Sequence, residues 1–402
     1  MRVLFVNPGA ELGGSERSLV DVLASFVAAG MPLEKKLILF EDGEVARRVR
    51  ALGIEVDVVP LPSALGALGE SKASGPAKLD AARAAGRALV SAVPYALRFR
   101  QSVRAFRPDL VHTNGMKAHV LTAAVVPELP RVVHLRDFPS DRPVTRRLLP
   151  WLGRRAVVVT NSRAVQADAL TLAPRLRSRV VYNGIDLDEF RPAPRELDWL
   201  ARLSGLEPPS EDAVVVGLVA SYAWWKGHLT FIEAARQVRH TAERPVRFYV
   251  VGGPIYRTQG SEVQRTDLEA ALGRAGLERD VGLVPFQHEV ARVYRGLDVL
   301  VHASERREPF GRTIVEAMAS ERAVVVARAG GAAELFSEGE SGLGFQPGDP
   351  AELARAIARL VGDAGERQRM ASQARVAAAL RFDRRRLSSE LAAVYDDVLG
   401  VG

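Results

Sequence analysis

Cysteine is absent from the 402 residues of this chain, which excludes disulfides, thiolate metal sites and a thiol nucleophile. Long apolar runs are missing too, since no stretch approaches the roughly 18 apolar residues that a membrane-spanning helix needs. The run before Asn7 holds only four apolar residues after the initial Met-Arg, fewer than the core of a secretory signal peptide requires. These absences predict a cytoplasmic protein without a secretory leader or a membrane span.

Lysine is scarce, with only six lysines among the 55 basic residues, and the charge is uneven. Residues 1–190 carry a net charge of +8 and residues 191–402 a net charge of −1. A basic first half favours an anionic partner, although a general arginine bias in the composition would give the same numbers. No recognisable nucleic-acid module and no interleaved aromatic residues accompany the charge, so we expect no nucleic-acid partner.

The composition that remains is that of an ordinary globular protein, 47% apolar and 26% charged. Short apolar runs rich in β-branched residues alternate with helical patterns, which favours parallel sheets covered by helices on both faces. Strands are expected at Arg2–Val6, Leu37–Phe40, Val56–Val59, Leu110–His112, Val132–Leu135 and Val157–Thr160, and again at Ala213–Ala220, Arg247–Val251, Val281–Leu283, Val299–His302 and Ala323–Ala327. Two successive sets of this kind predict two doubly wound α/β domains.

The alternation breaks where prolines cluster, over Phe190–Pro209, and this segment is the expected linker. We therefore assign residues 1–192 to a first domain and residues 193–382 to a second. In such folds ligands bind outside the carboxyl ends of the strands, and two facing domains leave a cleft there.

Three further segments stand out by composition or period. Pro62–Pro76 has no period and is expected to be a mobile loop. Lys78–Phe106 is basic and amphipathic, with an interruption expected at Pro94. The tail from Glu352 to Leu399 is helical by period, with a break near Arg381–Asp383.

The strongest local pattern is Glu308-Pro-Phe-Gly-Arg-Thr-Ile-Val-Glu316. Pro309 and Gly311 cannot lie inside a helix, so Glu308 is expected in a loop, with a helix beginning near Gly311–Thr313. The free N–H groups of a helix start bind anions. One of the two glutamates could then accept a hydrogen bond from a sugar hydroxyl and the other from ribose hydroxyls. Alternatively, the acids merely complement the helix dipole.

Two glutamates separated by seven residues, with Pro-Phe-Gly after the first and Ala-Met-Ala after the second, resemble the signature of family-4 glycosyltransferases. These are retaining enzymes of the GT-B fold, which implies two facing Rossmann-like domains with a cleft between them. The resemblance further implies that the first domain binds the acceptor and the second the nucleotide sugar. It also implies that residues 383–402 form a C-terminal helix that crosses back to the first domain.

Other segments match the same family pattern, among them Gly-Gly-x-Glu after the first strand, a strand-end His-x-x-Asp, Asn-Gly-Ile-Asp, Lys-Gly and Gly-Gly-x-x-Glu. The resemblance implies donor contacts for Gly13, Gly14, Ser221, Lys226, Phe286, Glu308, Phe310, Gly311, Arg312, Thr313, Glu316 and Glu334. It implies acceptor contacts for Asn114 and Asp137, and catalytic roles for His134, Glu308 and Lys226.

The expected phosphate site departs from the family at one position. Lys226, in a loop before a helix, is a natural phosphate ligand. Many relatives have an arginine five residues earlier, where this chain has Ser221, so Arg312 or backbone N–H groups would have to meet the second phosphate charge. No pattern of metal ligands or P-loop stands out, and the family generally needs no metal, so we expect neither a metal nor a cofactor.

The resemblance implies transfer of a sugar from a nucleoside-diphosphate sugar, with UDP favoured, to a hydroxyl of a glycan, a lipid-linked molecule or a secondary metabolite. Another GT-B sugar enzyme, such as a nucleotide-sugar epimerase or a phosphorylase, is the alternative. A dinucleotide oxidoreductase would need G-x-G-x-x-G after the first strand, which residues 7–14 do not provide.

Arginines lie among apolar residues in Lys78–Arg107 and in Arg142–Arg155. Basic amphipathic helices of this kind bind at membrane interfaces, so we expect peripheral contact with anionic lipid at the inner face of the membrane. A basic helix exposed only to water is the alternative.

Overall fold

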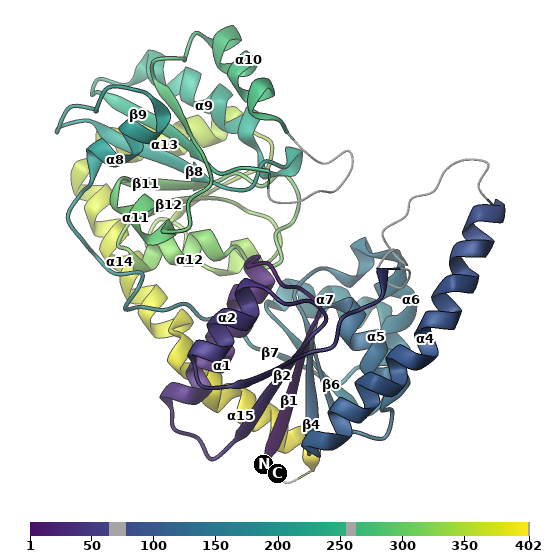
Figure 1. The fold of residues 1–402 in the computed structure, drawn as a ribbon. Coiled ribbons are helices and arrows are strands. Elements are labelled where there is room, and N and C mark those ends of the chain that lie inside the picture. The colour runs from purple at the N-terminus through teal and green to yellow at the C-terminus, as the bar shows by residue number, and fades with distance from the viewer. Residues whose placement is uncertain (64–77, 255–262, 401–402) are drawn as a thin grey trace. The chain divides into compact units, whose positions relative to one another are not determined.

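The computed structural model describes residues 1–63, 78–254 and 263–400, and within them the side chains of residues 78–90 are left out. The chain forms two compact units, one of Met1–Gly184 with Arg384–Gly402 and the other of Ile185–Asp383 (Figure 1). Most of the loop expected at Pro62–Pro76 lies outside the described residues. None of the described helices is long and apolar enough to cross a bilayer.

The first unit is built on a 7-stranded parallel sheet in the order β3-β2-β1-β4-β5-β6-β7. Its strands are β1 (Arg2–Asn7), β2 (Glu34–Leu39), β3 (Glu55–Val58), β4 (Leu110–Asn114), β5 (Arg131–Leu135), β6 (Ala156–Thr160) and β7 (Ser178–Val180). Its helices are α1 (Gly14–Ala28), α2 (Glu44–Ala51), α4 (Lys78–Phe106), α5 (Met116–Val125), α6 (Pro143–Leu152), α7 (Arg163–Leu172) and α15 (Leu387–Leu399), with short 3-10 turns η1 (Pro139–Asp141) and η4 (Arg384–Arg386).

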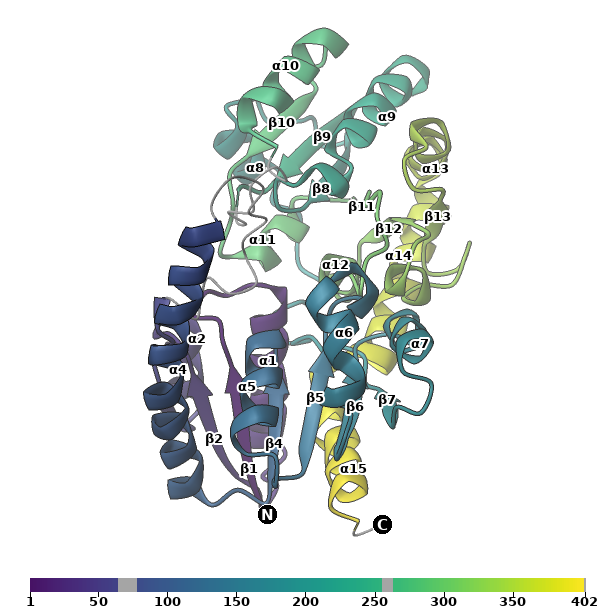
Figure 2. The ribbon, with the colours of Figure 1, turned by 90° about the vertical axis from the view of Figure 1, so that its right-hand side faces the viewer.

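Alternate strand residues bury opposite faces of this sheet, as a parallel sheet between helices requires. Val3 and Phe5 face a core shared with α1, α2 and α15, whereas Leu4 and Val6 face one shared with α4 and α5. Helices α6 and α7 continue that second layer along the sheet (Figure 2). The last helix of the chain therefore belongs to the core of the first unit.

The second unit has a 6-stranded parallel sheet in the order β10-β9-β8-β11-β12-β13. Its strands are β8 (Val214–Val219), β9 (Val246–Val251), β10 (Val281–Val284), β11 (Val299–His302), β12 (Ala323–Ala327) and β13 (Leu343–Phe345). Its helices are α8 (Leu197–Ser204), α9 (His228–Thr241), α10 (Arg265–Ala275), α11 (Val290–Arg295), α12 (Arg312–Ala319), α13 (Pro350–Gly362) and α14 (Ala364–Phe382), with turns η2 (Trp224–Lys226) and η3 (Gly331–Glu334).

Both sheets have the strand order of a Rossmann-like fold, which reverses direction between β1 and β4 and again between β8 and β11. Ligands of open α/β sheets bind at these switch points, outside the carboxyl ends of the strands. The order therefore directs attention to the loops that follow β1, β4 and β5 in one unit and β8, β11 and β12 in the other.

The structure differs from the sequence expectations in several elements. Strands β7 and β13 were not expected, because runs of three residues are too short to show a period. Helix α8 lies inside the expected linker and buries Leu200 and Ala201, so the proline-rich segment is part of the second unit. Helix α4 runs through Pro94 without interruption, with the proline exposed to solvent. The N-terminal segment of the first unit ends at Gly184, earlier than the expected residue 192.

The assignment of α15 to the first unit leads to a stability prediction. Leu391 on α15 is fully buried, whereas Leu380 on α14 is 78% exposed. Leu391→Ala should lower the free energy of unfolding by about 2–5 kcal/mol, because it leaves a cavity in the core of the first unit. The matched control Leu380→Ala should change it by less than about 0.5 kcal/mol. Urea unfolding followed by circular dichroism measures both, and equal effects would contradict the assignment.

Candidate functional site

Two loops of the second unit meet at its switch point. The loop after β8 ends in η2, and Lys226 and Gly227 immediately precede α9. Gly227 has φ +71°, and a Cβ added there would lie 1.9 Å from the carbonyl oxygen of Ala303. Only glycine allows this approach. It holds the loop that carries Lys226 against the residues just beyond β11.

The carboxylate of Glu308 is the centre of this site. Its Oε2 accepts a hydrogen bond from Lys226 Nζ at 2.6 Å and from Ser304 Oγ at 3.3 Å, and it lies 3.4 Å from His302 Nε2. Its Oε1 has no hydrogen-bond partner within the part of the chain that the structure describes. One oxygen is therefore saturated and the other is available to a ligand hydroxyl.

The backbone of Glu308 is fixed by the next loop. Its carbonyl accepts from Gly331 N at 2.7 Å, and its N–H donates to the carbonyl of Ala329 at 3.3 Å, both of them residues that follow β12. Glu334, in η3 of the same loop, accepts on its backbone carbonyl from Arg381 Nη2 at 2.6 Å. Three neighbouring strands thus contribute to one site.

The charge of Glu308 is set by opposing effects. Burial disfavours the carboxylate, but the positive charge of Lys226 and the contact with His302 outweigh it and hold the pKa of Glu308 well below its ordinary value. Glu308 is therefore ionised at neutral pH and forms an ion pair with Lys226, with side chains 17% and 21% exposed.

Glu316, the second glutamate of the motif, is occupied within the protein. It lies on α12, 4% exposed, and its Oε2 accepts from Tyr294 Oη at 2.9 Å. Its Oε1 accepts from Arg312 Nε at 3.2 Å, one turn earlier on the same helix. Arg312, expected to contact phosphate, is thus paired with Glu316. The ribose contact of Glu316 stays a prediction.

The helix start expected near Gly311 is present. Gly311 is the N-cap residue of α12 in a left-handed conformation with φ +99°, and Thr313 lies partly buried in the first turn. Phe310 is buried, with its ring 5.8 Å from that of Phe382. Its side chain therefore packs in the protein core, while the backbone around it forms the helix start.

The remaining donor candidates are divided between the two units. Phe286 is 40% exposed and follows β10, which β9 and β8 separate from β11. Ser221 follows β8 and is half-buried. In the first unit, Gly13 is the N-cap of α1 and Gly14 its first residue, directly after the turn that follows β1.

The switch point of the first unit holds a buried network of amides around Arg136. Asn114, at the end of β4, donates to Asn7 Oδ1 at 2.6 Å and to Ser15 Oγ at 3.2 Å. Arg136, just after β5, donates to Asn114 Oδ1 at 2.5 Å and to Asn183 Oδ1 at 2.6 Å. The side-chain amide of Asn114, one of the two acceptor candidates, is therefore engaged in hydrogen bonds inside the protein.

Asp137 has the opposite environment. Its side chain is 63% exposed and forms an ion pair with Arg142 at 3.3 Å. An ion pair as exposed as this one is weak and exchanges readily with other partners.

His134 lies on β5 in the same region and is 2% exposed. Its Nδ1 is 3.1 Å from His112 Nε2 and 3.5 Å from Arg136 Nη2. Burial, together with the charge of Arg136, lowers the pKa of His134 well below 6.5 and that of His112 to about 3. Both imidazoles are therefore neutral at physiological pH.

Comparison with known proteins accounts for this arrangement. A model of Glycosyltransferase Family 4 matches residues 43–189, and a model of Glycosyl transferases group 1 matches residues 206–377. A D-inositol 3-phosphate glycosyltransferase of Thermobispora bispora is 30% identical over 389 residues, covering 89% of this chain and 88% of that protein. The chain belongs to the glycosyl transferases group 1 family.

Other relatives of the family are similar over different lengths. A 2-deoxystreptamine glucosyltransferase of Streptomyces kanamyceticus is 33% identical over 231 residues, and the chain spans only 56% of its length. Crystal structures of HepE from Anabaena, in complex with UDP and with UDP-glucose, have TM-scores of 0.80 and 0.79. Their sequences are 28% and 27% identical to this chain. Each comparison covers 99% of this chain and 100% of the HepE chain. The expected Rossmann-like domains of a GT-B glycosyltransferase are confirmed.

Sequence reasoning missed several partners of the family motifs. His302 and Ser304, which hold Glu308, lie just before the motif, and their position after a strand could have drawn attention to them. Tyr294 and Tyr395 gave no such signal, because they reach Glu316 and His112 only through the folded structure, the latter across 283 residues.

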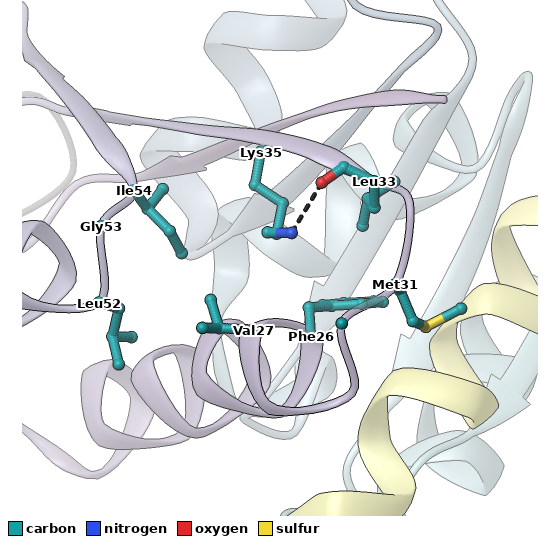
Figure 3. Close-up of a pocket in the computed structure, with 9 residues that line it drawn as sticks. Phe26, Val27, Met31, Leu33, Lys35, Leu52, Gly53 and Ile54 are labelled. Atoms are coloured by element: carbon teal, nitrogen blue, oxygen red, sulfur yellow. Dashed lines mark hydrogen bonds between the residues drawn. The ribbon is translucent and has the colours of Figure 1, made fainter.

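Two hollows in the described part of the chain lie away from these residues. One of about 380 Å³ is lined by Phe26, Met31 and Lys35, among others, and Lys35 Nζ donates to the carbonyl of Leu33 within it (Figure 3). It lies where α1 ends and β2 begins, at the amino ends of the strands. Another of about 590 Å³ lies beside α8.

The ion pair between Lys226 and Glu308 leads to a pH prediction. Because its pKa is held low, Glu308 stabilises the fold above the ordinary glutamate pKa, and this stability is lost as the pH falls through the lowered value. Lys226→Met should raise the pKa of Glu308 and lower the free energy of unfolding at pH 7 by about 1–3 kcal/mol. The loss of unfolding free energy should shrink as the pH falls towards about 4, because the raised pKa lets Glu308 of the variant take up a proton in that range.

Urea unfolding at several pH values measures this difference. The double variant Lys226→Met with Glu308→Gln is the control, since it has no carboxylate left to titrate at residue 308. Its deficit should stay constant above the ordinary glutamate pKa and shrink only below it, where the wild type loses the ion pair. A deficit of Lys226→Met that stays constant with pH would show that the ion pair does not set the charge of Glu308.

Proposed function

We propose that the chain is a retaining glycosyltransferase that moves a sugar from a UDP-sugar to a hydroxyl of its acceptor without a metal ion. The observation that carries the proposal is the Glu308 carboxylate, with Oε2 saturated by Lys226, Ser304 and His302 and Oε1 left to accept from a sugar hydroxyl. UDP as the nucleotide of the donor is supported by the complexes of the similar HepE with UDP and UDP-glucose.

The chemistry follows from charge at the leaving group. Departure of a nucleoside diphosphate needs positive charge at the pyrophosphate more than it needs a strong base. Lys226 supplies that positive charge once its ammonium group exchanges Glu308 for the pyrophosphate of the donor. The second phosphate charge has no arginine to meet it at residue 221, which is a serine in this chain. Arg312 already donates a hydrogen bond to Glu316. Backbone N–H groups at the start of α12 are therefore the better candidates for that role.

Independence from metal is supported by the side chains around the site. Among the described residues, no group of three or more His, Asp or Glu side chains could hold a metal ion. The lysine and the helix start replace the charge that a divalent ion would bring.

The acceptor is proposed from the names of the relatives. One acts on D-inositol 3-phosphate and another on 2-deoxystreptamine, and both of these compounds are hydroxylated six-membered carbocycles. We therefore propose a small cyclitol or a similar polyol as the acceptor. An epimerase, by contrast, would convert a UDP-sugar with no acceptor present, and a phosphorylase would form a sugar phosphate from a glycoside and inorganic phosphate.

The division of roles between the two glutamates can be tested by isothermal titration with UDP in EDTA. Glu316→Gln should weaken UDP binding about tenfold or more, because a charged acceptor of the ribose hydroxyls is lost. Glu308→Gln should leave UDP affinity within about threefold while lowering kcat, because it acts on the sugar. Equal losses of UDP affinity would contradict the division, and wild-type binding that requires Mg²⁺ would contradict metal independence.

We also propose that the first unit docks on anionic lipid through α4 and α6. Apolar side chains on these helices are open to solvent, with Val93 61%, Leu97 63% and Val144 48% exposed. Exposed arginines, Arg98 and Arg146, lie beside them. Both helices contact α5 and lie on the same face of the sheet (Figure 2). Apolar residues that insert and cations that meet headgroups are what such docking needs.

Vesicle co-sedimentation tests the docking. The wild type should pellet with vesicles that contain anionic lipid and stay in the supernatant with neutral ones, since each arginine near the surface contributes about 1 kcal/mol. Val93→Ser with Leu97→Ser should reduce the pelleted fraction severalfold, whereas Leu380→Ser, on the second unit, should not. Equal recovery with both lipid compositions would rule the docking out.

A further inference from the structure

Three side chains from distant parts of the sequence form a buried chain in the first unit. Tyr395 Oη of α15 lies 2.8 Å from His112 Nδ1 of β4, and His112 Nε2 lies 3.1 Å from His134 Nδ1 of β5. None of the three is more than 2% exposed. Strands β4 and β5 are neighbours in the sheet, and α15 packs against that face, so the fold itself brings the three groups into line.

The direction of the hydrogen bonds along this chain is set from both ends, by Tyr395, whose only hydrogen-bond partner among the described residues is His112, and by Arg136. Its guanidinium can only donate, and its Nη2 lies 3.5 Å from His134 Nδ1. His134 Nδ1 must then be an acceptor, so His112 donates to it from Nε2. A neutral His112 that donates from Nε2 accepts at Nδ1, and Tyr395 is left to donate its hydroxyl hydrogen there.

The opposite direction would put an N–H of His134 against an N–H of Arg136. His134 therefore carries its hydrogen on Nε2, and this atom is buried with no hydrogen-bond partner among the described residues. A buried donor left unpaired costs free energy, because it has given up its hydrogen bond to water. Such a donor is expected where a ligand completes the bond.

His119 provides an internal contrast. Thr113 Oγ1 donates to the carbonyl of Val132 at 3.0 Å and lies 2.7 Å from His119 Nδ1. Because the hydroxyl hydrogen is committed to the carbonyl, His119 must donate from Nδ1. Two neighbouring histidines, both buried, are thus held in opposite tautomers by their partners.

We propose that Tyr395 and His112 are positioning residues that hold His134 as an Nε2–H donor for a hydroxyl of the donor sugar. The inference rests on the proposed function and names a role for the last helix of the chain within it. His134 then donates a hydrogen bond to the sugar and has no free lone pair with which to accept a proton.

Long-range ¹H–¹⁵N spectra of the full chain, labelled with ¹⁵N-histidine, read the tautomers directly. In the ligand-free protein His134 and His112 should be Nε2–H and His119 Nδ1–H. Tyr395→Phe should leave His112 and His134 as mixtures of tautomers and His119 unchanged. His134 found as Nδ1–H in the wild type would overturn the proposal, with or without transferase activity.

Addition of UDP-glucose as the probe tests the ligand side. The Nε2–H resonance of His134 should shift, while that of His119 should not. If UDP-glucose binds by calorimetry and the His134 resonance stays in place, the donor role is wrong although the proposed function stands. If UDP-glucose does not bind, the proposed function is at fault, and the tautomers still decide the hydrogen-bond chain.

Kinetics separate positioning from a merely structural role. Tyr395→Phe and His112→Leu should each lower kcat about tenfold or more, with the KM for the nucleotide sugar changed less than threefold. His112→Gln should restore most of the rate, because its amide N–H can replace Nε2–H. Tyr249→Phe, a buried tyrosine of the second unit, is the matched control. Full activity of Tyr395→Phe with a single His134 tautomer would overturn the proposal.

Discussion

The close approach of Gly227 to the carbonyl of Ala303 is the constraint on which the second-unit site depends. With φ +71° and no room for a Cβ, the residue after Lys226 must be glycine. This contact joins the loops after two neighbouring strands and brings Lys226 Nζ to 2.6 Å from Glu308. A side chain at residue 227 would separate the loops, so the ion pair depends on a backbone feature that carries no charge.

Buried polar groups impose the complementary constraint, since each must find a partner or a ligand. In the second unit, Lys226, Ser304 and His302 saturate one oxygen of Glu308 and leave Oε1. In the first, Tyr395, His112 and Arg136 saturate one nitrogen of His134 and leave Nε2. Each network thus ends in a single open atom, an acceptor in one unit and a donor in the other.

Much of the fold follows from local pattern. Every strand expected from apolar runs is present, and the helix start at Gly311 is where proline and glycine require it. Strands β7 and β13 escaped because three residues show no period, and α8 because nearby prolines obscured it. The motif residues were identifiable one by one. What Tyr294 does for Glu316, or Tyr395 for His112, was not, because such contacts exist only after the chain has folded.

The two networks also limit where a proton can go in the proposed reaction. Glu308 has its pKa held well below the ordinary value, so it is a poor base. Lys226 is an ammonium in an ion pair, and His134, with its lone pair turned to His112 and Arg136, offers only an N–H. None of the three residues assigned catalytic roles can accept the proton of the acceptor hydroxyl. As the bond from the sugar to phosphate breaks and the bond to the acceptor oxygen forms, the departing phosphate oxygen is the base that remains in the proposed reaction.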